Sequence, residues 1–366
     1  MSRVRVLIVD DSALVRRLLQ EVLSSEQDIE VVGTASTASI ALSRIAALSP
    51  DVVTLDIEMP DMSGLELLAE IRKRAPKLPV IMFSSLTQRG AATTLDALAL
   101  GATDYVTKPS GAAGREAALE QVRTQLVPKL RVLAPRAMPS VERLTPAQRL
   151  DRVSFGETQR PSVLAVGCST GGPNALAEIF SRLPASLAAP VVIVQHMPPL
   201  FTRMLADRLA ANSPLRVREA SHGDVLTPGG VWIAPGDQHM RVERQGLSVV
   251  VALDKGPAEN SCRPAVDVLF RSVAEVYGDR TLALVLTGMG QDGLRGAEAI
   301  SARGGRIVAQ DEASSVVWGM PGAVVRAGLA GSVLPLHEIA DDVTRRLGSS
   351  ALLGASRMNM EGRRVG

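Results

Sequence analysis

A chain of 366 residues is long enough to form two domains, each of which can bury its own core. Apolar residues make up 46% of the chain but aromatic residues only 2%, so the cores must be built from Ala, Val, Leu and Ile, as in parallel strands covered by helices. Because 40 lysines and arginines nearly balance 38 aspartates and glutamates, the overall charge gives no general attraction to nucleic acid or to an anionic membrane.

Strand and helix signals alternate from the N-terminus. The strand-like runs are "VRVLIVD", "IEVVGTA", "DVVTLDI", "PVIMFSS" and "ATDYVTK", and helical patterns such as "ALVRRLLQEVLSS" lie between them. These strand–helix units predict a flavodoxin-like, doubly wound parallel sheet with the strand order 2-1-3-4-5 over residues 1–125.

Several features indicate where the protein works. The first strand begins without the charged leader, apolar core and cleavage site of a signal peptide. No apolar run approaches the roughly 18 residues that span a bilayer. The cysteines, Cys168 and Cys262, are too few for a disulfide framework or a cysteine-rich metal site. We therefore expect a soluble protein of the reducing cytoplasm.

The second half of the chain repeats the alternation after a break. Residues 126–161 gain Pro, Arg and Gln, lose apolar periodicity and are predicted to be an interdomain linker. From Ser162 onward, strand-like runs such as "VLAVG", "PVVIVQH", "LALVLTG" and "GRIVAQD" predict a second doubly wound, mainly parallel α/β domain over residues 162–348. Residues 349–366, rich in Ser, Gly and Arg, are predicted to be a flexible tail.

Polar side chains gather at the carboxyl ends of the first five strands. Asp10 and Asp11 close the first strand and Asp56 the third, and these strands are neighbours at the switch point of the predicted sheet. Three carboxylates in one crevice repel one another unless a hard cation such as Mg²⁺ neutralises them. Ser84 and Lys108 end the fourth and fifth strands. Any one acid could simply solvate a strand end, but the set predicts a phosphoryl-transfer site with a carboxylate nucleophile.

The motifs "VDD", "LDIEMPDMSG", "FSS" and "DYVTKP" resemble the receiver domain of two-component response regulators. The resemblance implies that Asp56 accepts a phosphoryl group from a histidine kinase and that Asp10, Asp11 and Asp56 hold Mg²⁺. It also implies that the phosphoryl oxygens contact Ser84 and Lys108, and that Tyr105 reports the switch.

The stretch "GCSTGGP" interrupts the second domain's first strand with a glycine-rich turn at Ser169. The turn could simply join a strand to a helix, with the serine as a cap. A phosphate cradle is poorly supported, because the stretch lacks the Lys-Ser/Thr end of a P-loop and the G-x-G-x-x-G pattern. Cys168, at an apolar strand end, fits a small buried side chain better than a reactive thiol. A serine nucleophile needs a base and an orienting carboxylate.

His196 is the predicted base, because it follows the next apolar strand and emerges at the same sheet edge as Ser169. Asp292, in the glycine-rich loop of "LTGMGQDG", is the predicted carboxylate. Asp311 is the competing candidate and Asp237 lies in a turn. The other histidines lie in predicted loops or open the terminal helix: His222, His239 and His337.

The chain order Ser, His, Asp differs from that of α/β-hydrolases, so that fold is not implied. The motifs "GCSTGGP", "VQHMP" and "TGMGQDG", within residues 162–346, resemble the catalytic domain of chemotaxis protein-glutamate methylesterases. The resemblance implies hydrolysis of glutamate methyl esters, and of the corresponding glutamines, on chemoreceptors. It assigns oxyanion binding to the turn at Thr170 and the loop at Met289. No cofactor is implied for this domain, and the spacing of its His and Cys residues does not suit zinc.

The two domains suggest regulation. We expect the unphosphorylated receiver to pack over the Ser169 crevice and phosphorylation of Asp56 to weaken that packing. The alternative is a response regulator whose second domain only docks a partner protein. Neither reading involves nucleic acid, since no basic stripe or helix-turn-helix module follows the linker, and neither requires insertion into a membrane.

Overall fold

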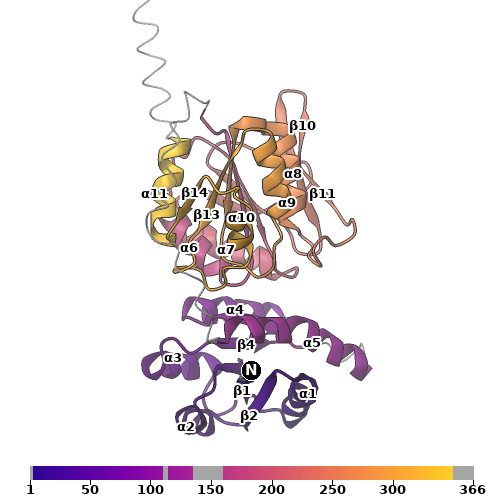
Figure 1. Ribbon diagram of the computed structural model, residues 1–366, viewed down its shortest axis with the longest axis vertical. Helices are drawn as coiled ribbons and strands as arrows, with labels where there is room; N and C mark the ends of the chain where they lie inside the picture. Colours follow the sequence, from indigo (N-terminus) through magenta and orange to yellow (C-terminus); the bar gives the residue numbers. More distant parts are fainter. Residues whose placement is uncertain (1–2, 110–113, 135–159, 349–366) are drawn as a thin grey trace, which may run out of the picture.

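The computed structural model describes residues 3–109, 114–134 and 160–348, which form two α/β domains (Figure 1). In the first, five parallel strands pair in the order β2-β1-β3-β4-β5, as predicted. The strands are β1 (Val4–Val9), β2 (Ile29–Ala35), β3 (Val52–Asp56), β4 (Val80–Ser84) and β5 (Asp104–Thr107).

Five helices cover this sheet: α1 (Ala13–Ser24), α2 (Ala38–Leu48), α3 (Gly64–Arg74), α4 (Gln88–Ala99) and α5 (Gly114–Leu133). The first four begin after a Ser or Thr whose hydroxyl accepts a backbone N–H of the first turn, which explains where they start. Helix α5 runs past residue 125, where the sequence places the end of the first domain.

The second domain contains seven parallel strands in the order β14-β13-β12-β6-β7-β9-β8. They are β6 (Val163–Cys168), β7 (Val191–Gln195), β8 (Arg216–Glu219), β9 (Gly230–Ile233), β12 (Thr281–Val285), β13 (Arg306–Gln310) and β14 (Ser332–Leu334). The helices are α6 (Gly172–Arg182), α7 (Phe201–Asn212), α8 (Val266–Tyr277), α9 (Leu294–Ala302), α10 (Met320–Arg326) and α11 (Leu336–Leu347), with one 3₁₀ turn, η2 (Gly278–Arg280). The predicted fold class is therefore confirmed.

Two strands of this domain escaped the sequence analysis. Strand β10 (His239–Gln245) pairs antiparallel with β11 (Ser248–Asp254) in a separate hairpin, so His239 opens a strand and does not lie in a loop. Strand β8 forms the edge of the large sheet. Both have charged residues at alternate positions, a pattern without the apolar run used to find the other strands.

Strand order places the candidate residues at one point. Strand β6 lies between β7 and β12 in the large sheet. The chain continues from β6 to β7 on one side and returns later to β12 on the other side, so the strand order reverses at β6. Ser169 follows β6, His196 follows β7, and the loop that carries Asp292 follows β12. Ligands bind at such switch points, beyond the carboxyl ends of the strands.

The two domains share apolar packing. One hydrophobic cluster includes Leu95 and Tyr105 of the first domain with Phe201 and Leu205 of the second. The rings of Tyr105 and Phe201 stack with centroids 4.7 Å apart and planes 7° apart. Figure 1 shows α4 and α5 lying between the first sheet and the second domain.

Close packing of β6 against α8 generates a prediction at Gly167. A Cβ added there would lie 2.4 Å from Cγ1 of Val266, the first residue of α8. We expect Gly167→Ala to lower the free energy of unfolding by about 1–3 kcal/mol, measured by urea denaturation, because the added methyl overpacks the core. In the Val266→Ala background the same substitution should cost less. Equal stability of Gly167→Ala and the native chain would contradict this account.

Candidate phosphoryl-acceptor and active sites

The candidate phosphoryl-acceptor site lies at the carboxyl edge of β1, β3 and β5. The Lys108 ammonium lies 2.7 Å from Asp56 Oδ1 and 3.2 Å from Asp10 Oδ2, and both aspartates are buried. Asp11 is exposed, yet carboxylate oxygens of Asp10, Asp11 and Asp56 lie within 4.8 Å of one another. The structure thus brings together the three predicted metal ligands and the predicted lysine.

Asp10 and Asp56 share a single cationic partner, Lys108, among the described residues. Burial, together with the charge of Asp10, raises the pKa of Asp56 to about 6 against the pull of Lys108. Burial also raises the pKa of Asp10, whose Oδ2 has the ion pair with Lys108 but no hydrogen bond among the described residues. Oxygen ligands of this kind fit a hard divalent cation such as Mg²⁺, which would stabilise the ionised carboxylates.

Ser84 links this edge to α4. Its hydroxyl donates toward the Gly90 carbonyl at 3.2 Å and accepts from Thr94 Oγ1 at 2.7 Å. Thr94 lies in α4, so any movement of the Ser84 hydroxyl toward Asp56 must break contacts with this helix. Tyr105, the predicted reporter, lies in the domain interface against Phe201.

In the second domain, hydrogen bonds hold the Ser169 turn against the loop after β12. The Ser169 N–H donates to the Thr287 carbonyl at 3.0 Å, and Thr287 Oγ1 donates to the Thr170 carbonyl at 2.9 Å. A Cβ on Gly288 would lie 3.0 Å from the Ser169 Cβ, so this loop approaches the serine because it carries a glycine.

His196 and Asp292 form a buried pair. His196 Nε2 lies 2.7 Å from Asp292 Oδ2, and only 13% of the His196 side chain is exposed. Because the carboxylate can only accept, Nε2 carries the donated hydrogen, and in the neutral ring Nδ1 is the nitrogen free to take a proton.

Asp292 is held by the start of α8. The N-cap, Ala265, has no side chain able to cap the helix, and the Asp292 carboxylate takes that role from a distant loop. Its oxygens accept the N–H of Val266 at 2.6 Å and that of Asp267 at 3.0 Å. Asn260 donates from Nδ2 to Asp292 Oδ1 and to Asp267 Oδ2, each at 2.9 Å. These bonds and His196 lower the pKa of Asp292 although burial opposes them, so the carboxylate stays ionised.

Cys262, which sequence reasoning did not select, lies at the other nitrogen of His196. Its Sγ is 3.6 Å from Nδ1, whereas Ser169 Oγ makes no hydrogen bond among the described residues. The structure therefore brings His196 to Asp292 and to Cys262, but not into a hydrogen bond with Ser169. No spacing signal could have found Cys262, because it approaches His196 from a loop 66 residues away.

The predicted oxyanion residues flank the serine. Within the described residues, the backbone N–H groups of Thr170 and Met289 donate to no protein acceptor. Thr170 is buried, and its hydroxyl donates to Asp104 Oδ2 of the first domain at 2.6 Å. Met289 packs against a hydrophobic cluster that includes Leu126 of α5.

The competing candidates lie elsewhere. Asp311 Oδ1 accepts from both the N–H and the hydroxyl of Ser314, in a local turn, and Asp237 pairs with Arg263. Cys168 is fully buried, which raises the pKa of its thiol. The other histidines do not contact Asp292: His222 accepts from the Leu253 N–H, His239 bonds Pro257 and Ala265, and His337 is exposed.

The surroundings of His196 generate a prediction for its titration. Burial lowers the pKa of His196, but the bonds to Asp292 and Cys262 outweigh burial and raise the pKa from 6.5 to about 10. The imidazolium should therefore persist through neutral pH and lose its proton only as the pH rises toward that value.

The titration midpoint should fall in Cys262→Ser and in Asp292→Asn, because each variant removes a group that favours the charged ring. The measurement is the histidine ring signal in NMR as a function of pH, with Cys168→Ala as the control that leaves both contacts in place. A midpoint near 6.5 in the native chain would contradict the geometry.

Comparison with known proteins covers both domains. The family model for CheB methylesterase matches residues 164–343, and that for the response regulator receiver domain matches residues 6–120. A protein of Trichodesmium erythraeum (strain IMS101) named protein-glutamate methylesterase/protein-glutamine glutaminase is 49% identical over 360 residues, 95% of this chain and 100% of that protein. A protein of the same name from Nocardioides sp. (strain ATCC BAA-499 / JS614) is 50% identical over 353 residues, 95% of this chain and 96% of that protein.

A solved structure agrees with the second domain. The crystal structure of the Thermotoga maritima CheB methylesterase catalytic domain is 44% identical, with a TM-score of 0.50, and the match covers 50% of this chain and 98% of that chain. The two relatives, which match 95% of the chain, and the two family models place the chain in the CheB methylesterase family, with a response regulator receiver domain ahead of its methylesterase domain.

Proposed function

We propose that this protein is a phosphorylation-activated serine hydrolase that demethylates glutamate methyl esters and deamidates glutamines on chemoreceptors. The observation that carries the proposal is that Ser169 and the His196–Asp292 pair follow neighbouring strands at one switch point, in a chain whose relatives are named for these activities. Two N–H groups beside them, of Thr170 and Met289, have no protein acceptor among the described residues.

The chemistry follows from which nitrogen of His196 is free. Ser169 Oγ attacks the side-chain carbonyl of the substrate, and Nδ1 of the neutral ring takes its proton, because Nε2 is bonded to Asp292. The ring reaches this neutral form once substrate displaces Cys262, whose contact favours the protonated ring. Asp292 holds the ring tautomer and stabilises the imidazolium. The proton then goes to the leaving group, which departs as methanol or ammonia. Water, deprotonated by Nδ1, then hydrolyses the acyl-enzyme. This step leaves a glutamate side chain on the receptor and restores the Ser169 hydroxyl. The Cys262 thiol must yield its place at Nδ1 for the serine to use it.

The tetrahedral intermediate needs preorganised donors. We assign this role to the N–H groups of Thr170 and Met289, because neither has a protein acceptor among the described residues. Thr170 follows Ser169 in the chain, and Met289 follows Gly288, which packs against Ser169. One such donor is worth about 2.7–4 kcal/mol in serine hydrolases.

In the receiver, we assign Asp56 as the carboxylate that takes a phosphoryl group from a histidine kinase. Asp10, Asp11 and Asp56 would hold Mg²⁺, which supplies positive charge to the transferred oxygens. Lys108 neutralises the same oxygens, and Ser84 donates a hydrogen bond once it leaves Gly90 and Thr94.

We further propose that the unphosphorylated receiver holds the second domain inactive through direct contacts with its active-site turn. Asp104, paired with Lys129, accepts the hydroxyl of Thr170, the residue after the nucleophile. The Asn174 amide donates to the Leu98 carbonyl of α4. Both bonds pin the Ser169 turn and the first turn of α6 to the receiver.

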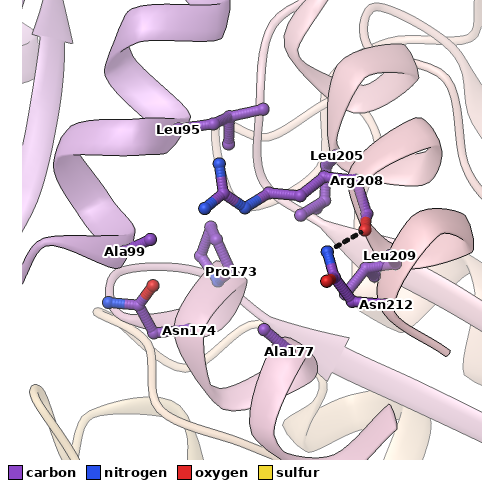
Figure 2. A pocket seen from close by; sticks show the side chains of 9 residues that line it. All are labelled: Leu95, Ala99, Pro173, Asn174, Ala177, Leu205, Arg208, Leu209 and Asn212. Atoms are coloured by element: carbon purple, nitrogen blue, oxygen red, sulfur yellow. Dashed lines mark hydrogen bonds between the residues drawn. The ribbon is translucent and has the colours of Figure 1, made fainter. Parts of the chain in front are cut away.

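The interface is also suited to reversible opening. A cavity of about 200 Å³ remains between α4 and helices α6 and α7, and Figure 2 shows the Arg208 side chain reaching across it toward α4. Arg208 pairs with Asp96 at 2.7 Å. Because unfilled space forfeits dispersion contacts, the domains are held less tightly than a filled interface would hold them. Release of Ser84 from α4 on phosphorylation would disturb this face.

No helix within the described ranges is long and apolar enough to cross a membrane. We place the protein in the cytoplasm, where the methylated helices of chemoreceptors lie.

We divide the chain into a receiver (1–125), a linker (126–161), a catalytic domain (162–348) and a tail (349–366), with one change: α5 continues the receiver to Leu133. The linker from residue 135 to residue 159 and the tail fall outside the described residues.

Methanol release from methylated chemoreceptor tests the activity. We expect release by the native chain to rise on addition of a small phosphodonor with Mg²⁺, and Ser169→Ala to abolish it, because the substitution removes the proposed nucleophile. Asp56→Asn should keep the basal rate but lose the response. Absence of release from folded, phosphorylated protein on several receptors would favour the docking-protein alternative.

Loss of an interface contact tests the inhibition. We expect Arg208→Ala to raise the activity of the unphosphorylated chain about two- to fivefold, the equivalent of one partly exposed ion pair. Arg115→Ala, which removes a pair with Glu21 inside the receiver, is the matched control and should leave the rate unchanged. A chain that begins at Pro161 should show the larger rise. If it were no more active than the unphosphorylated full chain, inhibition by the receiver would be wrong.

A further inference from the structure

A second cluster of metal-ligating side chains lies outside the receiver. Among the described residues, ligand atoms of His196, Cys262 and Asp292 lie within 4.8 Å of one another. They come from the end of β7, the loop before α8 and the loop after β12, so their spacing along the chain is unlike that of any sequence motif for zinc. We propose that Cys262 and His196 form an inhibitory binding site for a thiophilic divalent cation, with Zn²⁺ as the fitting ion.

The distance between the two ligand atoms fits one ion. A tetrahedral Zn²⁺ with a sulfur ligand at ~2.3 Å and a nitrogen ligand at ~2.0 Å separates those atoms by roughly 3.5 Å. The Cys262 Sγ and His196 Nδ1 lie 3.6 Å apart. An ion between them therefore needs only small movements of either side chain.

Asp292 orients the site without entering it. Its Oδ2 is occupied by His196 Nε2 and the Val266 N–H, and its Oδ1 by three further donors. With Nε2 fixed in this way, Nδ1 is presented to the sulfur, the arrangement in which a carboxylate steadies a metal-bound histidine. The protein thus offers two ligands, and water completes the coordination.

The donor set selects the ion. Sulfur and imidazole favour Zn²⁺ and related soft or borderline cations over Mg²⁺, which prefers the carboxylates of the receiver. Cys262 is half-buried and therefore open to a hydrated ion, whereas Cys168 is fully buried. Two protein ligands predict weaker, reversible binding than a closed structural zinc site provides.

Binding would remove the base from the reaction. The ion bonds to the Cys262 sulfur and to the lone pair of Nδ1, and the thiol proton, with the ring proton where Nδ1 carries one, leaves to solvent. Nδ1 can then no longer take the proton of Ser169. Inhibition rests on the proposed function, but binding does not.

Cobalt substitution tests binding without any assay of activity. The full-length protein, with excess Mg²⁺ at the receiver, is titrated with Co²⁺ and the thiolate-to-cobalt charge-transfer absorption is followed. We expect the band to rise with added Co²⁺ and to saturate at one bound ion per chain in the native chain and in Cys168→Ala, and Zn²⁺ to bleach it. Cys262→Ser should lose the band, because oxygen ligands do not produce it. A folded native chain without the band, or a band that persists in Cys262→Ser or disappears in Cys168→Ala, would overturn the site.

Inhibition is measured separately as methanol release at increasing Zn²⁺, each variant relative to its own metal-free rate. We expect Cys262→Ser to need at least tenfold more Zn²⁺ than the native chain or Cys168→Ala for half inhibition. Equal sensitivity of all three proteins would overturn the inhibitory role. A cobalt band in a protein that releases no methanol would instead uphold the metal site and remove the proposed esterase function.

Discussion

The Asp292 carboxylate is the centre on which the second domain's site depends. It lies in the loop after β12, yet it accepts the first N–H groups of α8, the Asn260 amide and His196 Nε2. One buried charge therefore caps a helix that lacks its own cap, joins three segments and decides which imidazole nitrogen remains free. The helix N-terminus in return keeps the carboxylate ionised in a buried setting.

From this centre the constraints extend to the serine. The close approach of Gly288 and the bonds between Thr287 and the 169–170 turn hold the nucleophile to the same loop that carries Asp292. Thr170 of this turn also donates a hydrogen bond to Asp104 of the receiver. A change in the receiver thus reaches the residue beside the nucleophile through a single hydrogen bond, and no long pathway through the second core is required.

Cys262 gives this site a chemical property that the serine mechanism does not need. The Cys262 sulfur beside Nδ1 favours the protonated form of His196, competes with the serine for this nitrogen and adds a soft ligand. The base is therefore held in a resting contact that substrate binding has to replace.

The sequence by itself determined both α/β domains, the strand order of the first and the candidate residues at strand ends. It could do so because buried parallel strands are continuous apolar runs, and because the carboxyl ends of such strands share one edge. Strands β8 and β10 were missed, since alternating charges conceal an edge strand and a hairpin strand from that pattern.

Only the tertiary structure decided the partners of each candidate. The contacts distinguish Asp292 from Asp311. Asp292 is hydrogen-bonded to His196, whereas Asp311 accepts from Ser314 in a local turn. Cys262, Asn260 and the Asp104–Thr170 bond join positions far apart in the chain, and no local spacing encodes them. Periodicity in a sequence reports which face of an element is buried, whereas contacts between loops depend on how complete elements pack.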